Sequence, residues 1–267
     1  MYRAYWGMEF NPFSKEIKEK QLFHGKDYEE TIKRLEYLRT IRGIGLLTGA
    51  SGTGKTCALR AFTTDLNSSL YKVVYLSMTT ITTNEFYKDL ATGLGLEPSS
   101  RKIDNFRLIQ ERIQMMYKEQ KITLLLIIDE SQYLHKGILA DLKLLMNFQM
   151  DSQNYAILIL CGQPHLNNIL SMQIHEALRQ RIVINYNYQG LQAQEVKEYV
   201  KDRMKQCGVK ASIFTDAALE ALHGCCGGSI RRLNTLILKA LMIGCEKEEK
   251  EMDTETIMDA ASEMELM

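Results

Sequence analysis

A glycine-rich loop at residues 49–56 constrains the fold of this chain more than any other segment. It reads GASGTGKT, an unbroken match to the pattern G-x-x-x-x-G-K-[ST]. The apolar residues Ile44, Leu46 and Leu47 predict a buried strand before it, and CALRAFTTDL predicts a helix after it. This order places a helix N-terminus at the phosphates of a bound nucleotide. We therefore expect nucleotide binding rather than a purely structural glycine turn.

Each residue type in the loop suits one part of a nucleotide. Glycines permit a tight backbone whose N–H groups point at phosphate oxygens. The Lys55 ammonium group is expected to reach the β- and γ-phosphates, and the Thr56 hydroxyl is expected to ligate Mg²⁺. The predicted nucleotide-binding residues of the loop are Gly49, Ala50, Ser51, Gly52, Thr53, Gly54, Lys55, Thr56 and Cys57.

Apolar runs and helical patterns alternate up to about residue 189. Beyond the strand before the loop, strands are predicted over 72–77, 122–130, 155–162 and 182–188. Other helices are predicted over 27–41, 83–93, 104–119 and 136–150. Continuous apolar runs are typical of strands that are buried on both faces. We therefore expect an α/β fold with a parallel five-stranded sheet sandwiched by helices.

From about residue 190 onward, only helical patterns remain. Four helices are predicted, in segments that begin at Gln192, Thr215, Ser229 and Thr254, with Thr215 as an N-cap. We therefore expect three parts along the chain. They are an aromatic N-terminal arm (1–25), an α/β nucleotide-binding core (26–189) and a small all-α lid (190–267).

Two acids close the most apolar predicted strand, LLLII. Ligands bind at the C-terminal edge of a parallel sheet, so Asp129 and Glu130 are expected in the nucleotide site. Asp129 is predicted to hold Mg²⁺ through water, together with Thr56. Glu130 is predicted to be the general base for the attacking water. Gln163 follows a strand expected beside that of Asp129 and is placed to sense the γ-phosphate, with a turn or capping role as the alternative.

Three arginines and one aromatic residue are further candidates. Arg179 and Arg181 precede the last predicted strand, and either is placed to reach a nucleotide on a neighbouring subunit. An intrachain salt bridge is the alternative for each. Arg231 opens a lid helix, where a guanidinium group suits contact with the γ-phosphate, and a solvated helix face is the alternative. Phe13 is a candidate for packing against adenine, and core packing explains it equally well.

Composition narrows the class of protein. The 33 Lys and Arg residues balance 33 Asp and Glu residues, so the net charge is zero, which argues against a protein dominated by a basic nucleic-acid surface. Six cysteines without C-x₂-C spacing favour free thiols in a reducing compartment. The N-terminus lacks the apolar core of a signal peptide, and no apolar run approaches the roughly 18 residues of a membrane span. We therefore expect a soluble, cytoplasmic protein without membrane contact.

The motifs together resemble those of AAA+ ATPases, and more narrowly those of the ExeA/TniB/TnsC-like group. WGMEFNPFS is similar to the G-x-x-x-N-P-F arm of ExeA-like proteins. LLTGASGTGKT, LLLIIDESQYL, LILCGQPHL, LRQRI and GGSIRRLNTLILKAL follow in the family's order. The resemblance implies a Mg²⁺-dependent ATPase centre made by Lys55, Thr56, Asp129 and Glu130. It also implies that Gln163 is the first sensor, Arg181 the arginine finger and Arg231 the second sensor.

One position departs from the family pattern. Ile230 stands where the family usually has Pro before the lid arginine. Proline fixes the first turn of a helix, so its absence puts the start of the lid helix in doubt. The presence of Arg231 is unaffected.

Two broad functions occur in the group that the chain resembles. Longer members carry a membrane span and serve secretion, whereas short members accompany transposases. Because this chain ends soon after the lid, the resemblance favours an ATP-dependent regulator of DNA transposition. Such a protein forms a ring or helical filament on double-stranded DNA in its ATP state and recruits a DDE-type transposase. A helicase loader and a secretion-type (ExeA-like) switch are the alternatives.

Two polar loops are the candidate DNA contacts under this interpretation. The first follows the second predicted strand and carries Thr79, Thr80, Thr82 and Thr83. The second, SSRK, carries Arg101 and Lys102. Hydroxyl groups and cations suit contacts to phosphate without reading of bases. Solvated polar loops are the alternative.

Overall fold

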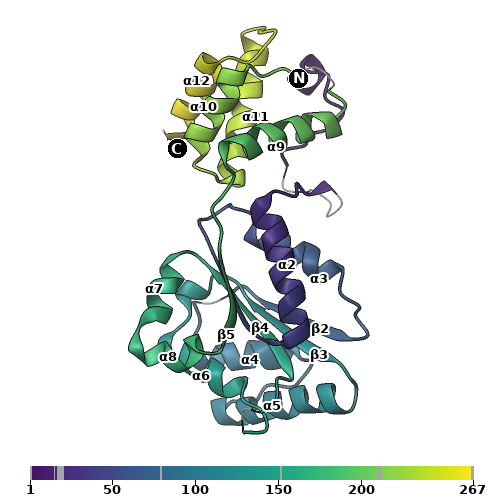
Figure 1. The fold of residues 1–267 in the computed structure, drawn as a ribbon, viewed down its shortest axis with the longest axis vertical. Coiled ribbons are helices and arrows are strands. Elements are labelled where there is room, and N and C mark those ends of the chain that lie inside the picture. The colour runs from purple at the N-terminus through teal and green to yellow at the C-terminus, as the bar shows by residue number, and fades with distance from the viewer. Residues whose placement is uncertain are drawn as a thin grey trace. The chain divides into compact units, whose positions relative to one another are not determined.

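The structure is a computed structural model that describes residues 2–14, 16, 21–78, 80–150, 152–209 and 212–265 (Figure 1). The chain forms two compact units, and each is described by itself. The first unit comprises Met1–Glu29, Ala50–Cys57 and Gln189–Met267. The second unit comprises Glu30–Gly49 and Ala58–Tyr188.

A five-stranded parallel sheet forms the centre of the second unit. The strand order is β2-β3-β4-β1-β5, and each neighbouring pair in this order is parallel. Every residue of β1, β3 and β4 is buried, as expected for strands covered on both faces. The predicted sheet is therefore confirmed. The strands are β1 Gly43–Thr48, β2 Tyr71–Leu76, β3 Thr123–Ile128, β4 Ala156–Gly162 and β5 Ile182–Asn187.

Helices cover both faces of this sheet. Along β3, Leu124, Leu126 and Ile128 join one apolar cluster, and Leu125 and Ile127 join another. The first cluster also contains residues of α4 to α8, and the second contains residues of α2 and α3. The helices are α2 Lys26–Ile41, α3 Lys55–Thr64, α4 Thr83–Gly93, α5 Lys102–Lys118, α6 Lys136–Leu145, α7 His165–Ser171 and α8 Glu176–Arg179, with short 3₁₀ turns η2 Ser131–Tyr133 and η3 Gln173–His175.

Helix α6 is shorter than the sequence predicts. The periodicity indicates a helix over 136–150, but α6 ends at Leu145 with Met146 as its C-cap. Phe148 then forms an isolated antiparallel bridge, and Gln149 has a φ of +50°, which a right-handed helix excludes. Met146 and Phe148 are buried in the same cluster as the helix, so the apolar pattern continues after the helix has stopped.

The first unit owes its core to helices. The apolar residues of α9 to α12 form one buried cluster that also includes Trp6 and Phe13 of the N-terminal arm. The Trp6 indole N–H donates to the Leu241 carbonyl at 2.9 Å, which fixes the arm in this core. The predicted N-cap is confirmed, because the Thr215 side chain accepts from the N–H of Ala218. The helices are α1 Tyr2–Tyr5, α9 Ala193–Gln206, α10 Asp216–Cys226, α11 Ile230–Glu246 and α12 Thr254–Glu265.

Two sequence expectations concern the chain as a whole. Among the described residues, no helix combines the length and hydropathy that crossing a bilayer requires. All six cysteines are free thiols. The division into arm, core and lid stays a prediction.

Candidate nucleotide site

The loop between β1 and α3 has a backbone that depends on its glycines. Gly52 and Gly54 have φ values of +79° and +100°, which other residues rarely adopt. The Lys55 side chain is buried, and its Nζ donates to the Ala50 carbonyl at 2.8 Å. The Thr53 hydroxyl donates to the same carbonyl at 2.9 Å. A compact loop of this kind, with a cation inside it and a helix starting at Lys55, suits a polyphosphate.

The N-terminus of α11 binds this loop through three hydrogen bonds. The Ser229 hydroxyl donates to the Ser51 carbonyl at 3.1 Å, and the Arg231 N–H donates to the Gly52 carbonyl at 3.2 Å. The Arg231 guanidinium group also donates to the Ser51 hydroxyl at 3.1 Å. A Cβ atom on Gly52 would lie 2.5 Å from Ser229 Oγ and 2.7 Å from Arg231 Cβ, so only glycine permits this approach. The structure thus brings the predicted lid arginine to the predicted loop.

The lid helix starts at the expected position although Ile230 replaces the usual proline. Helix α11 begins at Ile230, and the hydroxyl of its N-cap Ser229 accepts from the N–H of Arg232. Serine is a strong N-cap, so the capping bond fixes the helix start without proline.

The two predicted acids lie directly after β3, at the C-terminal edge of the sheet. Asp129 is 6% exposed. Its Oδ2 accepts from the Tyr75 hydroxyl at 2.7 Å, and its Oδ1 accepts from the N–H of Glu130 at 2.9 Å. Burial, followed by the bond to Asp129, raises the pKa of Tyr75, so this hydroxyl remains a donor at neutral pH. Tyr75 thereby fixes the orientation of the predicted Mg²⁺-binding carboxylate.

A glutamine connects Glu130 to the end of β4. The Gln132 Nε2 donates to Glu130 Oε2 at 2.6 Å, and its Oε1 accepts from the N–H of Gln163 at 3.0 Å. Strands β3 and β4 are parallel neighbours, as the sequence predicts for the strands that precede Asp129 and Gln163. Glu130, Gln132 and Gln163 are therefore part of one connected group at this edge.

The start of the phosphate loop is anchored at the same edge. The N–H of Gly49 donates to the carbonyl of Gly162 at 3.2 Å. Gly162 is the last residue of β4 and directly precedes Gln163. Within the second unit, the end of β1 and the end of β4 are thus joined by a main-chain bond.

The arginine-finger candidates bind carbonyl groups of their own chain. Arg179 Nη1 donates to the Ser171 carbonyl at 2.9 Å, and Arg181 Nη1 donates to the Lys143 carbonyl at 2.7 Å. These contacts resemble the intrachain alternative, although the acceptors are carbonyls rather than carboxylates. A role on a neighbouring subunit stays a prediction for both residues.

Phe13 lies within the helical core of the first unit, where it is 3% exposed. Core packing, the alternative that the sequence left open, describes this position in the structure. A contact with adenine stays a prediction.

The threonine loop has a structural role at the start of α4. Thr82 is the N-cap: its hydroxyl accepts from the N–H of Glu85, and the Glu85 carboxylate accepts from the N–H of Thr82 in a capping box. Thr83 is the first residue of the helix, and Thr80 is exposed. Thr79 lies outside the described residues.

The two cations of the second polar loop are paired with acids. Lys102 Nζ lies 2.5 Å from Asp141 Oδ2, and Arg101 Nε lies 3.8 Å from Asp104 Oδ2. The pairing reduces the charge that this loop presents to a phosphate backbone. DNA contact by Thr82, Thr83, Arg101 or Lys102 stays a prediction.

Sequence reasoning missed three residues: Tyr75, Gln132 and Ser229. Tyr75 stands next to last in β2, and only the observed pairing of β2 with β3 brings it to Asp129. Gln132 follows Glu130 at a spacing that a 3₁₀ turn brings together, but the turn itself carried no sequence signal. Ser229 was detectable, because a serine directly before an apolar helical pattern is typical of an N-cap.

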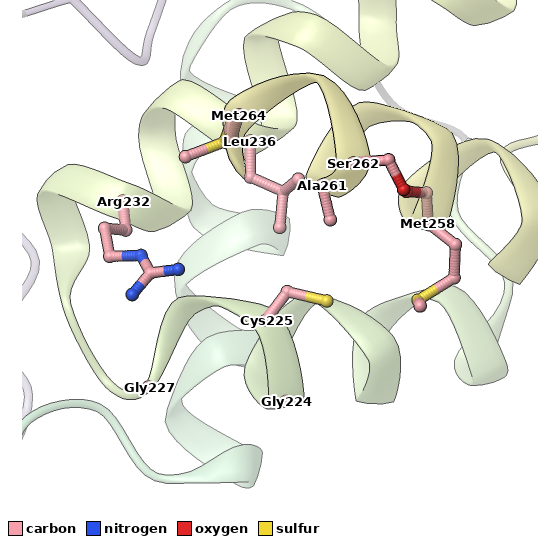
Figure 2. A pocket seen from close by; sticks show the side chains of 9 residues that line it. All are labelled: Gly224, Cys225, Gly227, Arg232, Leu236, Met258, Ala261, Ser262 and Met264. Atoms are coloured by element: carbon pink, nitrogen blue, oxygen red, sulfur yellow. The ribbon is translucent and has the colours of Figure 1, made fainter. Parts of the chain in front are cut away.

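A separate pocket lies among the helices of the first unit and has a volume of about 360 Å³. Figure 2 shows the Cys225 and Arg232 side chains at its border, with apolar side chains of α11 and α12 across from Cys225. None of the predicted nucleotide-binding residues is among its lining residues, so it is distinct from the phosphate loop. The lining residues are Gly224, Cys225, Gly227, Arg232, Leu236, Met258, Ala261, Ser262 and Met264.

Comparison with known proteins gives one family model and one curated relative that are similar to this chain. Residues 39–170 match the family model described as AAA domain. General secretion pathway protein A of Aeromonas hydrophila is 30% identical over 246 residues, which cover 91% of this chain. This chain spans 44% of that relative's length.

Solved structures of low sequence identity share the fold. Cdc6p of Pyrobaculum aerophilum has a TM-score of 0.69 at 15% identity, covering 94% of this chain and 70% of that chain. The ORC2 protein of Aeropyrum pernix, solved as ADPNP–ADP complexes, has a TM-score of 0.67 at 15% identity, covering 96% and 71%.

These comparisons support part of the resemblance drawn from the motifs. The similarity to general secretion pathway protein A agrees with the ExeA-like features of the chain, whereas the TniB/TnsC-like subgroup is not confirmed. The predicted fold class is confirmed: the chain has the AAA+ P-loop fold, with a parallel five-stranded sheet, flanking helices and a C-terminal helical region.

Proposed function

We propose that this chain is an ATP-hydrolysing switch of the secretion type, whose nucleotide state controls its assembly with itself and with a protein partner. One observation carries the proposal. An unbroken phosphate-binding loop stands in a chain that aligns over 91% of its length with general secretion pathway protein A. The loop supports the proposed ATP hydrolysis, and the alignment supports the proposed secretion-type function.

In this proposal, the loop and the acids divide the work of hydrolysis. Backbone N–H groups and Lys55 bind the phosphates, and Arg231 contacts the γ-phosphate from the lid. Glu130 takes a proton from the attacking water, whose oxygen forms a bond to the γ-phosphorus as the bond to ADP breaks. ATP and water thereby yield ADP and phosphate.

The residues present fit a bound Mg²⁺. Mg²⁺ prefers hard oxygen ligands such as hydroxyl and carboxylate groups, and Thr56 and Asp129 supply one of each. The Tyr75 hydroxyl donates to Asp129 and thereby orients its carboxyl group, which supports this assignment. When bound, Mg²⁺ neutralises charge on the β- and γ-phosphates.

The secretion-type switch is preferred to the transposition regulator for two reasons. The sequence interpretation depended on chain length, but this chain spans 44% of a relative with a secretion name, so length does not separate the two functions. In addition, Lys102 and Thr82 have structural partners, which weakens the two loops as a DNA surface. The test below also detects a DNA-dependent function, in which the partner is a transposase or a replicative helicase.

The test measures ATP turnover and particle mass together. Wild-type protein and the Lys55→Ala variant are incubated with ATP and Mg²⁺, with and without duplex DNA, and studied by light scattering coupled to size exclusion. We expect turnover that requires Lys55 and Mg²⁺, and ATP-dependent assembly without DNA. Turnover that persists in Lys55→Ala would contradict the ATPase assignment. Assembly that requires DNA would instead favour the transposition regulator or the helicase loader.

A further inference from the structure

The side chain of Gln132 makes one hydrogen bond with each of two groups expected to act on ATP. It donates to the Glu130 carboxylate at 2.6 Å and accepts from the main chain of Gln163 at 3.0 Å. Gln132 is 9% exposed, and both of these bonds are partly buried. A buried amide with one donor bond and one acceptor bond is held in a single orientation, because losing either bond leaves a polar group unpaired.

The turn that carries Gln132 is itself fixed to the sheet. The Ser131 hydroxyl is buried and donates to the carbonyl of Ile128, the last residue of β3, at 2.7 Å. Glu130 precedes this turn with a left-handed backbone, φ 50° and ψ 36°. Non-glycine residues adopt this conformation at a cost, and such strain is concentrated at functional sites. The strained residue is therefore held by the turn after it.

Gly162 gives independent evidence that the position of the Gln132 amide matters. A Cβ atom built on Gly162 would lie 2.5 Å from Gln132 Oε1 and 3.1 Å from Leu166 Cδ2. Gly162 has no positive φ that would require glycine for the backbone. The absence of a side chain at this position therefore leaves room for the Gln132 amide.

We propose that Gln132 is a positioning residue that holds the Glu130 carboxylate and the main chain at Gln163 at a fixed separation. The group that takes the water's proton and the residue that senses the γ-phosphate then move together. A movement of the main chain at Gln163, after the end of β4, is transmitted to the Glu130 carboxylate through the Gln132 side chain. This inference depends on the proposed ATPase function, since it assigns Gln132 a task within that reaction.

The first experiment removes both hydrogen bonds and keeps the volume of the side chain. In Gln132→Met, we expect kcat for ATP hydrolysis to fall about tenfold, because misplacement of a catalytic group lowers the rate of the chemical step. The KM for ATP and the affinity for an ATP analogue should stay within about twofold, since neither hydrogen bond of the Gln132 side chain goes to a residue of the phosphate loop. Gln110→Met is the matched control, because Gln110 also bridges two groups, the Leu144 and Asn147 carbonyls. It should leave kcat unchanged.

The second experiment separates positioning from a loss of structure. Single-turnover rates are measured for Gln132→Met in the wild-type and in the Glu130→Gln background. A positioning residue has little left to position once the carboxylate is gone, so the tenfold loss should shrink to about twofold or less. An equal loss in both backgrounds would overturn the inference. Gly162→Ala should lower kcat in the same way as Gln132→Met, and its failure to do so would also count against the inference.

The outcomes also distinguish this inference from the proposed function. Wild-type protein without ATP turnover would overturn the ATPase proposal and the inference with it. Wild-type turnover with an unchanged kcat in Gln132→Met would overturn the inference alone.

Discussion

The phosphate loop and the acidic edge of the sheet are shaped by different forces. The loop is defined by its backbone: Gly52 and Gly54 have positive φ values, and Lys55 donates to a carbonyl five residues before it. The acidic edge is defined by side chains that bind one another across strands, such as Tyr75 with Asp129, 54 residues apart. Both regions supply charged groups, but the conformation of the loop comes from its own backbone, whereas the acidic edge is oriented by side-chain bonds between neighbouring strands.

This difference teaches how each region should fail when it is altered. A loop fixed by backbone geometry fails through strain and collision, which affects binding of nucleotide. An edge fixed by side-chain bonds fails through lost orientation, which affects the chemical step and leaves binding intact. Substitutions in the loop should therefore raise the KM for ATP, whereas substitutions at the acidic edge should lower kcat.

The largest expected effect is at the acidic edge. In Glu130→Gln, the predicted general base is replaced by a neutral amide of the same shape, so turnover should fall by a factor of about 10²–10⁴. ATP binding should remain, because the loop is untouched. Steady-state turnover and titration with an ATP analogue test both statements. Normal turnover in this variant would show that Glu130 is not the general base. It would also weaken the proposed difference between the loop and the acidic edge.

The next effect is at the loop. In Gly52→Ala, the new Cβ atom collides with Ser229 and Arg231, and the backbone is strained at a φ of +79°. We expect about tenfold weaker ATP binding and a loss of roughly 1–2 kcal/mol in stability from the left-handed backbone alone. Gly95→Ala is the matched control: its φ is +76°, but among the described residues no atom beyond its chain neighbours lies within 4 Å of its Cβ position. It should lose stability without losing affinity, as measured by thermal unfolding and nucleotide titration.

The sequence predicts most of what is local in these regions. The glycines, Lys55 and Thr56 are recognisable because each suits phosphate or Mg²⁺ within eight consecutive residues. Asp129 and Glu130 are recognisable because they close a continuous apolar strand. The sheet follows from the alternation of strands and helices, and the N-cap at Thr215 follows from its residue type.

What the sequence does not predict depends on contacts between distant segments. Gln132 and Gln163 are 31 residues apart, and Ser229 and Ser51 are 178 residues apart. Their contacts require strand order and helix position, which no local pattern encodes. The early end of α6 has the same origin, since tertiary burial of Phe148 maintains an apolar pattern that periodicity alone assigns to a helix.

A smaller effect tests the support of Asp129. Tyr75→Phe removes the hydroxyl that donates to Asp129 Oδ2 at 2.7 Å and leaves the ring in place. We expect kcat to fall about three- to tenfold, because the variant loses one hydrogen bond that orients the predicted Mg²⁺ ligand. The Mg²⁺ concentration that gives half-maximal turnover should rise. Tyr37→Phe, at an exposed position on α2, is the control and should change neither quantity. An unchanged Mg²⁺ dependence in Tyr75→Phe would show that Asp129 is held by its other contacts.

The smallest expected effect concerns stability rather than catalysis, and it comes from a residue outside both the loop and the acidic edge. His175 is 1% exposed, and neither of its ring nitrogens has a hydrogen-bond partner within the described part of the chain. Burial, followed by the charge of Lys136, lowers the pKa of His175 in the folded state.

The sign of the resulting pH dependence follows from linkage. An unfolded histidine binds a proton below a pH of about 6.5, whereas folded His175 resists protonation until a lower pH. Between these two values the unfolded state holds more protons, so the free energy of unfolding should fall as the pH drops from 7 to 5. In His175→Met this decline should be smaller, as measured by urea unfolding at each pH. Because His175 is neither at the loop nor at the acidic edge, kcat at pH 7 should stay unchanged; an equal decline in both proteins would mean that other groups govern acid stability.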